Sequence, residues 1–163
     1  MNSYSILDQI GNTPMVVSKN LNTNPKVKLL FKLEGNNPGG SVKDRPAYYM
    51  IKSAMDRGEI NKETKIIEAT SGNTGIALAM IASLLELDLE LVMPENSTKE
   101  RVQTMRAFGA LVTLTPADVG IEGARDYAES KVRDHGYVML NQFANPDNWK
   151  AHYMTTGPEI WRD

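Results

Sequence analysis

The chain has 163 residues, of which 41% are hydrophobic and 23% are charged, and its 18 basic and 20 acidic residues give a net charge of −2. This composition is typical of a soluble globular chain and excludes collagen-like, low-complexity and disordered classes. The near-neutral balance argues against nucleic acid or an anionic membrane as the main partner. The absence of cysteine excludes disulfides, zinc–thiolate sites and catalysis by a thiol of the chain itself. No apolar run approaches the ~20 residues that span a bilayer, so we expect a cytoplasmic location.

Short apolar runs along the chain predict strands. Val27, Leu29, Phe31 and Leu33 alternate with mostly charged residues, which predicts a strand over residues 26–34 with one face in solvent. Four compact apolar runs indicate strands that are buried on both faces, and they cover residues 66–67, 89–93, 111–114 and 137–140.

Helical patterns separate these runs. The spacing of Ala47, Met50, Ile51, Ala54 and Met55 predicts a helix that ends near Gly58. Further helices are predicted over residues 73–86, from a capping box of Ser97 and Glu100 to Gly109, over residues 121–135, and from Trp149 to Ile160 with an interruption at Gly157-Pro158. Helices that alternate with buried strands require crossover connections, so the predicted fold class is α/β with a parallel twisted sheet flanked by helices.

A glycine-rich turn with a lysine at the start of a helix is the first candidate site. Three glycines and two asparagines precede Lys43, where a positive charge opposes the positive end of the helix dipole. Burial and the dipole both lower the pKa of an amine placed there, which favours a nucleophilic lysine that reacts with a carbonyl group. The alternative is a solvated surface lysine whose charge Asp44 offsets.

A polar loop between a strand and an apolar helix is the second candidate site. The loop contains Thr70, Ser71, Gly72, Asn73 and Thr74, and hydroxyl, amide and backbone N–H groups at a helix N-terminus are suited to holding a carboxylate or phosphate. The alternative is an ordinary N-cap by Ser71 or Asn73.

Gln142 follows another predicted strand and could add an amide to the same edge of the sheet. The alternative there is a polar turn with Asn-Pro chemistry.

Several other chemistries lack their motifs. The dinucleotide pattern G-x-G-x-x-G and the phosphate loop G-x-x-x-x-G-K-[ST] are absent. His135 and His152 are not at metal-ligand spacing, so we expect no metal site. No G-x-S-x-G elbow supports a serine triad.

The blocks LEGNNPGGSVKDR, EATSGNTGIALAMIA, LVMPEN, MRAFGA, QFANPDN and TTGPEIW resemble the cysteine synthases (O-acetylserine sulfhydrylases), and two of them are most similar to the B-type. These are pyridoxal-phosphate enzymes of fold-type II. The resemblance implies that Lys43 binds pyridoxal 5′-phosphate covalently and that Asn73 hydrogen-bonds the cofactor. It also implies that Thr70, Ser71, Gly72, Thr74 and Gln142 contact the substrate carboxylate. The implied substrates are O-acetylserine and sulfide or thiosulfate, and the implied assembly is a homodimer.

The resemblance also implies a domain organisation. Residues 46–148 correspond to the smaller, mobile domain, and residues 1–45 and 149–163 to incomplete pieces of the larger, cofactor-binding domain. Family members are longer and carry their phosphate-binding loop further downstream, so we expect this chain alone to bind the cofactor poorly. Cystathionine β-synthase, a serine/threonine dehydratase and an inactive fragment remain alternatives.

Overall fold

The computed structural model describes residues 5–163 and confirms the α/β class. A four-stranded parallel sheet has the order β5-β4-β3-β6, with β3 at Lys65–Ala69, β4 at Asp88–Pro94, β5 at Leu111–Thr115 and β6 at Val138–Met139. The chain builds the sheet outward from β3 to β5 and then returns to the opposite side of β3 to add β6. The order of the strands therefore reverses between β3 and β6, which is where ligands bind in open α/β sheets.

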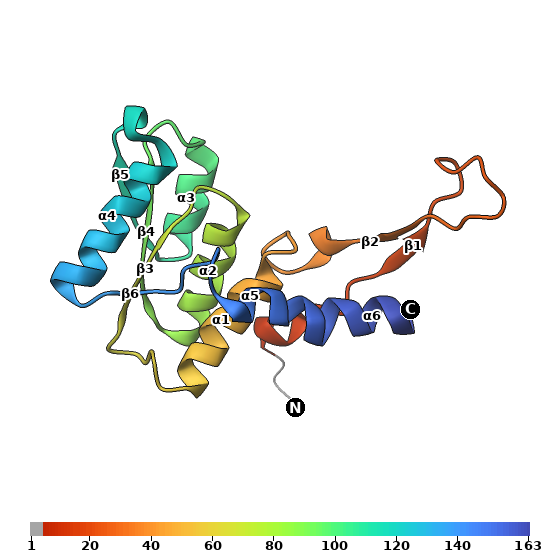
Figure 1. Cartoon of the computed structure of the whole chain (residues 1–163), viewed down its shortest axis with the longest axis horizontal. Coiled ribbons are helices and arrows are strands. Elements are labelled where there is room, and N and C mark those ends of the chain that lie inside the picture. The colour runs from red at the N-terminus through yellow and green to blue at the C-terminus, as the bar shows by residue number, and fades with distance from the viewer. Residues whose placement is uncertain (1–4) are drawn as a thin grey trace.

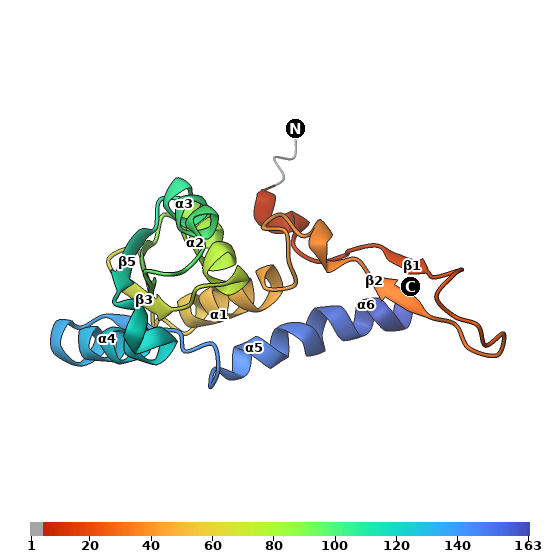
Figure 2. The ribbon, with the colours of Figure 1, turned by 90° about the horizontal axis from the view of Figure 1, so that it is seen from above.

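Helices cover both faces of this sheet (Figure 2). One face carries α1 (Asp44–Asp56), α2 (Asn73–Leu85) and α3 (Lys99–Ala107), and the other carries α4 (Gly120–His135). Neighbouring residues of β3 point to opposite faces, because Ile66 belongs to the core cluster of α1 and α2 whereas Ile67 packs with Ala124 and Ala128 of α4. The core consequently has two layers, one on each side of the sheet.

A second group of elements extends away from the parallel sheet (Figure 1). Strand β1 (Met15–Val17) pairs antiparallel with β2 (Leu30–Lys32) in a separate hairpin. Helix α5 (Pro146–Ala151), a π-helical turn (His152–Thr156) and α6 (Gly157–Arg162) form one rod that runs toward this hairpin. Short 3₁₀ helices lie at Ile6–Gln9, Glu34–Asn36 and Ala117–Val119. Within residues 5–163, no helix is both long and apolar enough to cross a membrane.

The structure corrects two strand predictions. The strand predicted over residues 26–34 is reduced to Leu30–Lys32, and because it pairs with β1 outside the parallel sheet, Phe31 remains 40% exposed. The run at residues 111–114 forms β5 as predicted, but β5 is an edge strand, so Leu111 and Leu114 are exposed rather than buried on both faces.

The helix boundaries are mostly as predicted, with two corrections. Gly58 and Gly109 follow α1 and α3 with positive φ angles, as expected of glycines that end helices. The capping box at Ser97 is wrong, because Thr98 occupies the N-cap of α3 and no side chain caps that helix. The Gly157-Pro158 pair does not interrupt the last helix either, since a π-helical turn precedes it and Pro158 lies in the first turn of α6, where a missing N–H is tolerated.

Candidate functional site

The polar loop at residues 70–74 and Gln142 come together at the carboxyl end of the sheet. Strands β3 and β6 are parallel neighbours in which Ile67 pairs with Met139. Thr70 and Gln142 each lie three residues beyond these partners, so the two predicted binding segments follow adjacent strands in register. They lie at the point where the strand order reverses, and the structure thus assembles two of the three candidate segments.

The first turn of α2 has no side-chain cap. Gly72 occupies the N-cap position, and no side chain accepts a hydrogen bond from the first backbone N–H groups. The alternative interpretation, in which Ser71 or Asn73 caps the helix, is therefore wrong. Thr70 and Thr74 are buried, Ser71 is half-buried and Asn73 is exposed. Unsatisfied N–H groups at the positive end of a helix, with hydroxyls beside them, form an arrangement suited to an anion.

Helix α3 supports this loop from one side. Arg101 donates a hydrogen bond from Nη1 to the backbone oxygen of Ser71 at 3.3 Å. A Cβ atom on Gly75 would lie 2.7 Å from the Met105 side chain and 3.0 Å from that of Thr70. Glycine at position 75 therefore allows the start of α2 to pack closely against both α3 and the loop.

Lys43 is half-buried and immediately precedes α1. Its backbone N–H donates to Ser41 Oγ at 3.1 Å, and among residues 5–163 its ammonium forms no ion pair. Asp44 forms no ion pair with Lys43 within the described residues, so no direct contact supports the charge offset of the surface-lysine interpretation. The buried Asp44 carboxylate accepts from the Gly39 backbone N–H, and its Oδ1 atom has no hydrogen-bond partner. Burial raises the pKa of Asp44, while the Gly39 N–H opposes this rise.

The π-helical turn faces the start of α1. Burial lowers the pKa of His152, and the positive charges of Arg45 and Lys43 lower it further. His152 Nδ1 lies 2.9 Å from Thr156 Oγ1. Among residues 5–163, no hydrogen bond joins the Lys43 side chain, at the N-cap of α1, to the 70–74 loop.

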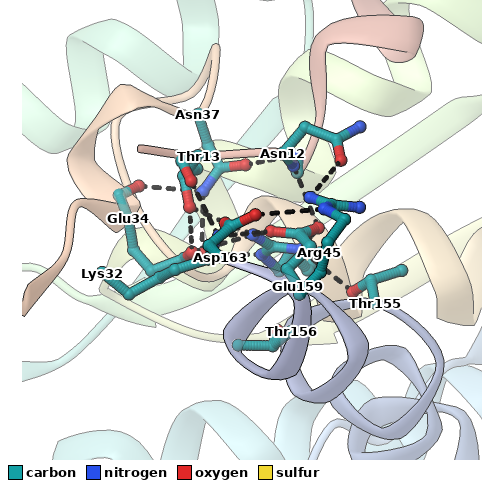
Figure 3. A network of polar contacts seen from close by, with 12 residues as sticks. Asn12, Thr13, Lys32, Glu34, Asn37, Arg45, Thr155, Thr156, Glu159 and Asp163 are labelled. Atoms are coloured by element: carbon teal, nitrogen blue, oxygen red, sulfur yellow. Dashed lines mark hydrogen bonds and ion pairs between the residues drawn. The ribbon is translucent and has the colours of Figure 1, made fainter. Parts of the chain in front are cut away.

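Arg45 is the centre of a buried ion network (Figure 3). Its guanidinium donates to Glu34 at 2.7 and 2.8 Å and to Glu159 at 2.6 and 2.7 Å. It also donates to Thr155 Oγ1 at 3.0 Å and to Thr13 Oγ1 at 3.2 Å. One side chain in the first turn of α1 therefore connects the amino-terminal segment to the carboxyl-terminal helix.

Lys32 extends the same network. Its ammonium lies 2.9 Å from carboxylate oxygens of both Glu159 and Asp163, and it donates to the Thr13 backbone oxygen at 2.7 Å. Burial alone would raise the pKa of Glu159, but hydrogen bonds from Arg45, the Asn12 backbone and Lys32 outweigh burial and lower this pKa to about 2. The network thus holds Glu159 in its charged form.

Sequence reasoning missed three buried charged residues near the site. Glu68, Arg45 and Glu159 lie inside the motif blocks, yet none was given a role. Glu68 contacts the segment that carries Gln142, and its partners are 73 and 74 residues away along the chain. Arg45 and Glu159 are 114 residues apart. Local patterns contain no signal for contacts of such long range.

Sequence comparison identifies the class of protein to which this fold and site belong. The family profile described as pyridoxal-phosphate dependent enzyme matches residues 6–163. The chain belongs to this family.

Individual relatives are cysteine synthases. The chain is 52% identical to cysteine synthase B of Pseudomonas syringae over 97% of its own length and 94% of that relative. It is also 52% identical to cysteine synthase B of Escherichia coli, again over 97% of its length but over only 52% of that relative. The chain therefore spans about half the length of the E. coli protein, and about half of cysteine synthase B of Pseudomonas aeruginosa.

Solved structures agree with this assignment. A hydrogen sulfide-producing enzyme from Fusobacterium nucleatum superposes with a TM-score of 0.91 at 47% identity, over 99% of this chain and 53% of that one. O-acetylserine sulfhydrylase isoform 3 from Entamoeba histolytica superposes with a TM-score of 0.93 at 40% identity, over 99% of this chain and 50% of that one. The fold is that of the fold-type II cysteine synthases.

The ion network predicts an acid-sensitive contribution to stability. The Glu159 pKa is lower in the folded state than in the unfolded chain, so its stabilisation is complete above about pH 4.5 and is lost as the pH falls toward 2. A Glu159→Gln variant should lose on the order of 3 kcal/mol of unfolding free energy at pH 7, because Arg45 and Lys32 then lack a buried carboxylate. Urea denaturation between pH 2 and 7 measures this difference.

The exposed glutamate Glu63 provides the matched control for this prediction. Glu63→Gln should change the unfolding free energy by less than about 0.5 kcal/mol at every pH. Equal pH profiles for the wild type and Glu159→Gln would contradict the role assigned to the network.

Proposed function

We propose that this chain is part of a B-type cysteine synthase. The reaction replaces the acetate group of O-acetyl-L-serine with sulfide to form L-cysteine, or with thiosulfate to form S-sulfocysteine. The observation that carries the proposal is the uncapped 70–74 loop beside Gln142 at the switch point of the sheet, in a chain 52% identical to proteins named cysteine synthase B.

The cofactor of the proposed reaction is pyridoxal 5′-phosphate, as the family implies. The residues fit this group, because Lys43 is half-buried and has no ion pair within residues 5–163, and Asn73 is exposed at the start of α2. Lys43 would bind the cofactor covalently, and Asn73 would donate a hydrogen bond to it. When bound, the cofactor supplies an electron sink for the charge that develops on the substrate α-carbon.

The 70–74 loop and Gln142 would hold the substrate carboxylate. The loop hydroxyls of Thr70, Ser71 and Thr74 and the amide of Gln142 supply donors, and Gly72 allows the substrate to approach the backbone. The positive end of the α2 dipole adds a favourable field. Binding at this point orients the α-carbon and excludes water from it.

Lys43 would also act in proton transfer. In the proposed reaction the substrate amino group would take the place of Lys43 on the cofactor, and the freed Lys43 amine would take the proton from the substrate α-carbon while acetate leaves from the β-carbon. Sulfide would then add at that β-carbon, and Lys43 would return the proton to the α-carbon.

We further propose that residues 46–148 move as the smaller domain, with residues 1–45 and 149–163 belonging to the larger one; the first four residues of the chain lie outside the described part. The Arg45 network lies at this boundary and supports the proposal, because it joins Glu34 and Glu159 of the two flanking pieces. If the α/β unit moved, the Arg45 network would still fix the start of α1 against the flanking pieces. Lys43, two residues before Arg45, would keep its position there.

A second candidate is suggested by one structural neighbour. The O-acetylserine dependent cystathionine β-synthase from Helicobacter pylori is 42% identical over 99% of this chain, with a TM-score of 0.89. Such an enzyme would use homocysteine in place of sulfide. Parallel assays of O-acetylserine with sulfide and with homocysteine separate the two functions.

Replacing Lys43 tests the proposal directly. In a full-length protein that contains this chain, supplied with pyridoxal phosphate, O-acetylserine and sulfide, the wild type should form cysteine and show the absorbance of covalently bound cofactor. Lys43→Ala should lose both signals, because it removes the covalent anchor and the base. The control is Lys52→Ala on the same helix, whose exposed lysine pairs with Asp56. Normal cysteine formation by Lys43→Ala would refute the assignment.

Substitutions in the loop test carboxylate binding. Ser71→Ala and Thr74→Ala should each weaken O-acetylserine binding by about 1–3 kcal/mol, because each removes a hydrogen bond to a charged group. Ser83→Ala, at an exposed position near the end of α2, should leave binding unchanged. Isothermal titration measures the three affinities. Unaltered affinity in both loop variants would mean that the loop only begins the helix.

We also propose that the protein is a cytoplasmic homodimer. Large apolar side chains lie exposed along α5, the π-helical turn, α6 and the hairpin, including Trp161 at 93%, Tyr153 at 72% and Trp149 at 60% exposure. Exposed apolar surface of this kind is typical of a surface that another protein covers. Sedimentation equilibrium should give twice the mass of one chain, and the mass of a single chain at all concentrations would contradict the dimer.

A further inference from the structure

The segment that carries Gln142 is not held by the sheet ladder itself. The pairing of β3 with β6 comprises Ile66 with Val138 and Ile67 with Met139, so it ends before Gln142. Asn141 then adopts a left-handed backbone conformation with φ of 54°, which turns the chain away from the strand direction. Another interaction must therefore set the position of Gln142 relative to the 70–74 loop.

Glu68 supplies that interaction. Its Oε2 accepts the backbone N–H of Asn141 at 2.9 Å, and its Oε1 accepts the backbone N–H of Gln142 at 3.0 Å. Glu68 is only 2% exposed and lies on β3, two residues before Thr70. One carboxylate on the strand that leads into the 70–74 loop therefore binds both successive N–H groups of the segment that follows β6.

Two asparagines hold the same segment from its other side. Asn148 donates to the backbone oxygen of Gln142 at 2.6 Å, and Asn145 donates to that of Leu140 at 2.8 Å. These contacts come from the start of α5, whereas the Glu68 contacts come from β3. Glu68 is consequently the side chain that ties the Gln142 segment to the strand bearing the loop.

The burial of this carboxylate indicates a specific requirement. Burial raises the pKa of Glu68, and the N–H groups of Gln142 and Asn141 oppose that rise. The two N–H groups are donors that an apolar residue would leave unsatisfied.

We propose that Glu68 is a positioning residue that holds Gln142 in register with the 70–74 loop, so that both contact the same substrate carboxylate. The carboxylate part of this inference rests on the proposed function. Glu68 acts through Gln142, because both of its own oxygens accept backbone N–H groups.

The test compares Glu68→Gln with Glu90→Gln. Glu90 is a matched control, since it is 4% exposed, lies on β4 of the same sheet and accepts a hydrogen bond from Thr113 at 2.7 Å. A glutamine at position 68 keeps one acceptor but directs an NH₂ group at the second backbone N–H. Amide hydrogen exchange, which needs neither cofactor nor substrate, should accelerate about tenfold or more at Asn141 and Gln142 in Glu68→Gln alone.

Kinetics on the cofactor-loaded protein provide the second readout. Glu68→Gln should raise the KM for O-acetylserine about tenfold while kcat changes less than about threefold, the pattern of lost substrate binding. Gln142→Ala should raise the KM little further when it is added to Glu68→Gln, but should have its full effect on KM when it is added to Glu90→Gln. The effects of two substitutions depart from additivity only when the residues are coupled. If Glu68→Gln folds poorly, Glu68→Asp replaces it in both measurements, since aspartate keeps the charge but has a shorter side chain. Faster exchange at Asn141 and Gln142 and a raised KM are expected for this variant as well.

Unchanged exchange at Asn141 and Gln142 would overturn the positioning role, and accelerated exchange with an unchanged KM would overturn its link to the carboxylate. Absence of cysteine formation by the wild type would instead refute the proposed function. The exchange result would still decide whether Glu68 holds the segment.

Discussion

The parallel pairing of β3 with β6 is the constraint on which the proposed site depends. The chain leaves β3 through α2 on one face of the sheet and returns to β6 through α4 on the other, so the paired residues Ile67 and Met139, 72 residues apart, lie at the same edge. Only two residue pairs form this ladder, and the polar segments begin where it stops. Because the ladder is short, the backbone that follows it is free to turn toward a ligand. Side-chain contacts must then fix the position of this backbone, since hydrogen bonds of the sheet do not.

Two buried charged side chains, Glu68 and Arg45, fix the backbone near the proposed site. Glu68 binds backbone N–H groups, whereas Arg45 is bound by two carboxylates and two hydroxyls. Both are almost fully buried, and a buried charge that loses its partner is strongly unfavourable. The positions of Gln142 and of the start of α1 are therefore specified by interactions that tolerate little displacement. The proposed catalytic lysine, two residues before Arg45, benefits from this rigidity.

The parts of the molecule that depend on local pattern could be predicted from the sequence. The four compact apolar runs all form strands, although not all of them are buried, and Gly58 and Gly109 follow helices as expected. Periodicity does not reveal the neighbours of a strand, which is why the exposure of Leu111 on an edge strand and the shortness of β2 were not predicted. The motif residues were recognised because their types and spacing suit an anion. Glu68 and Glu159 were not, because their partners are distant in the chain and identical side chains elsewhere are merely solvated.

The π-helical turn at His152–Thr156 has a consequence for how the protein tolerates change. A turn of this kind contains one residue more than a regular α-helical turn, which rotates everything that follows by about 100° around the rod. With this extra residue, Ala151 is buried while Glu159, further along the same rod, meets Arg45. If residues 152–156 formed a regular α-helix with no residue removed, the Glu159 side chain would be turned away from Arg45. The π-helical turn therefore sets the rotation of α6 relative to α5, so that Ala151 is buried and Glu159 reaches Arg45 from the same rod.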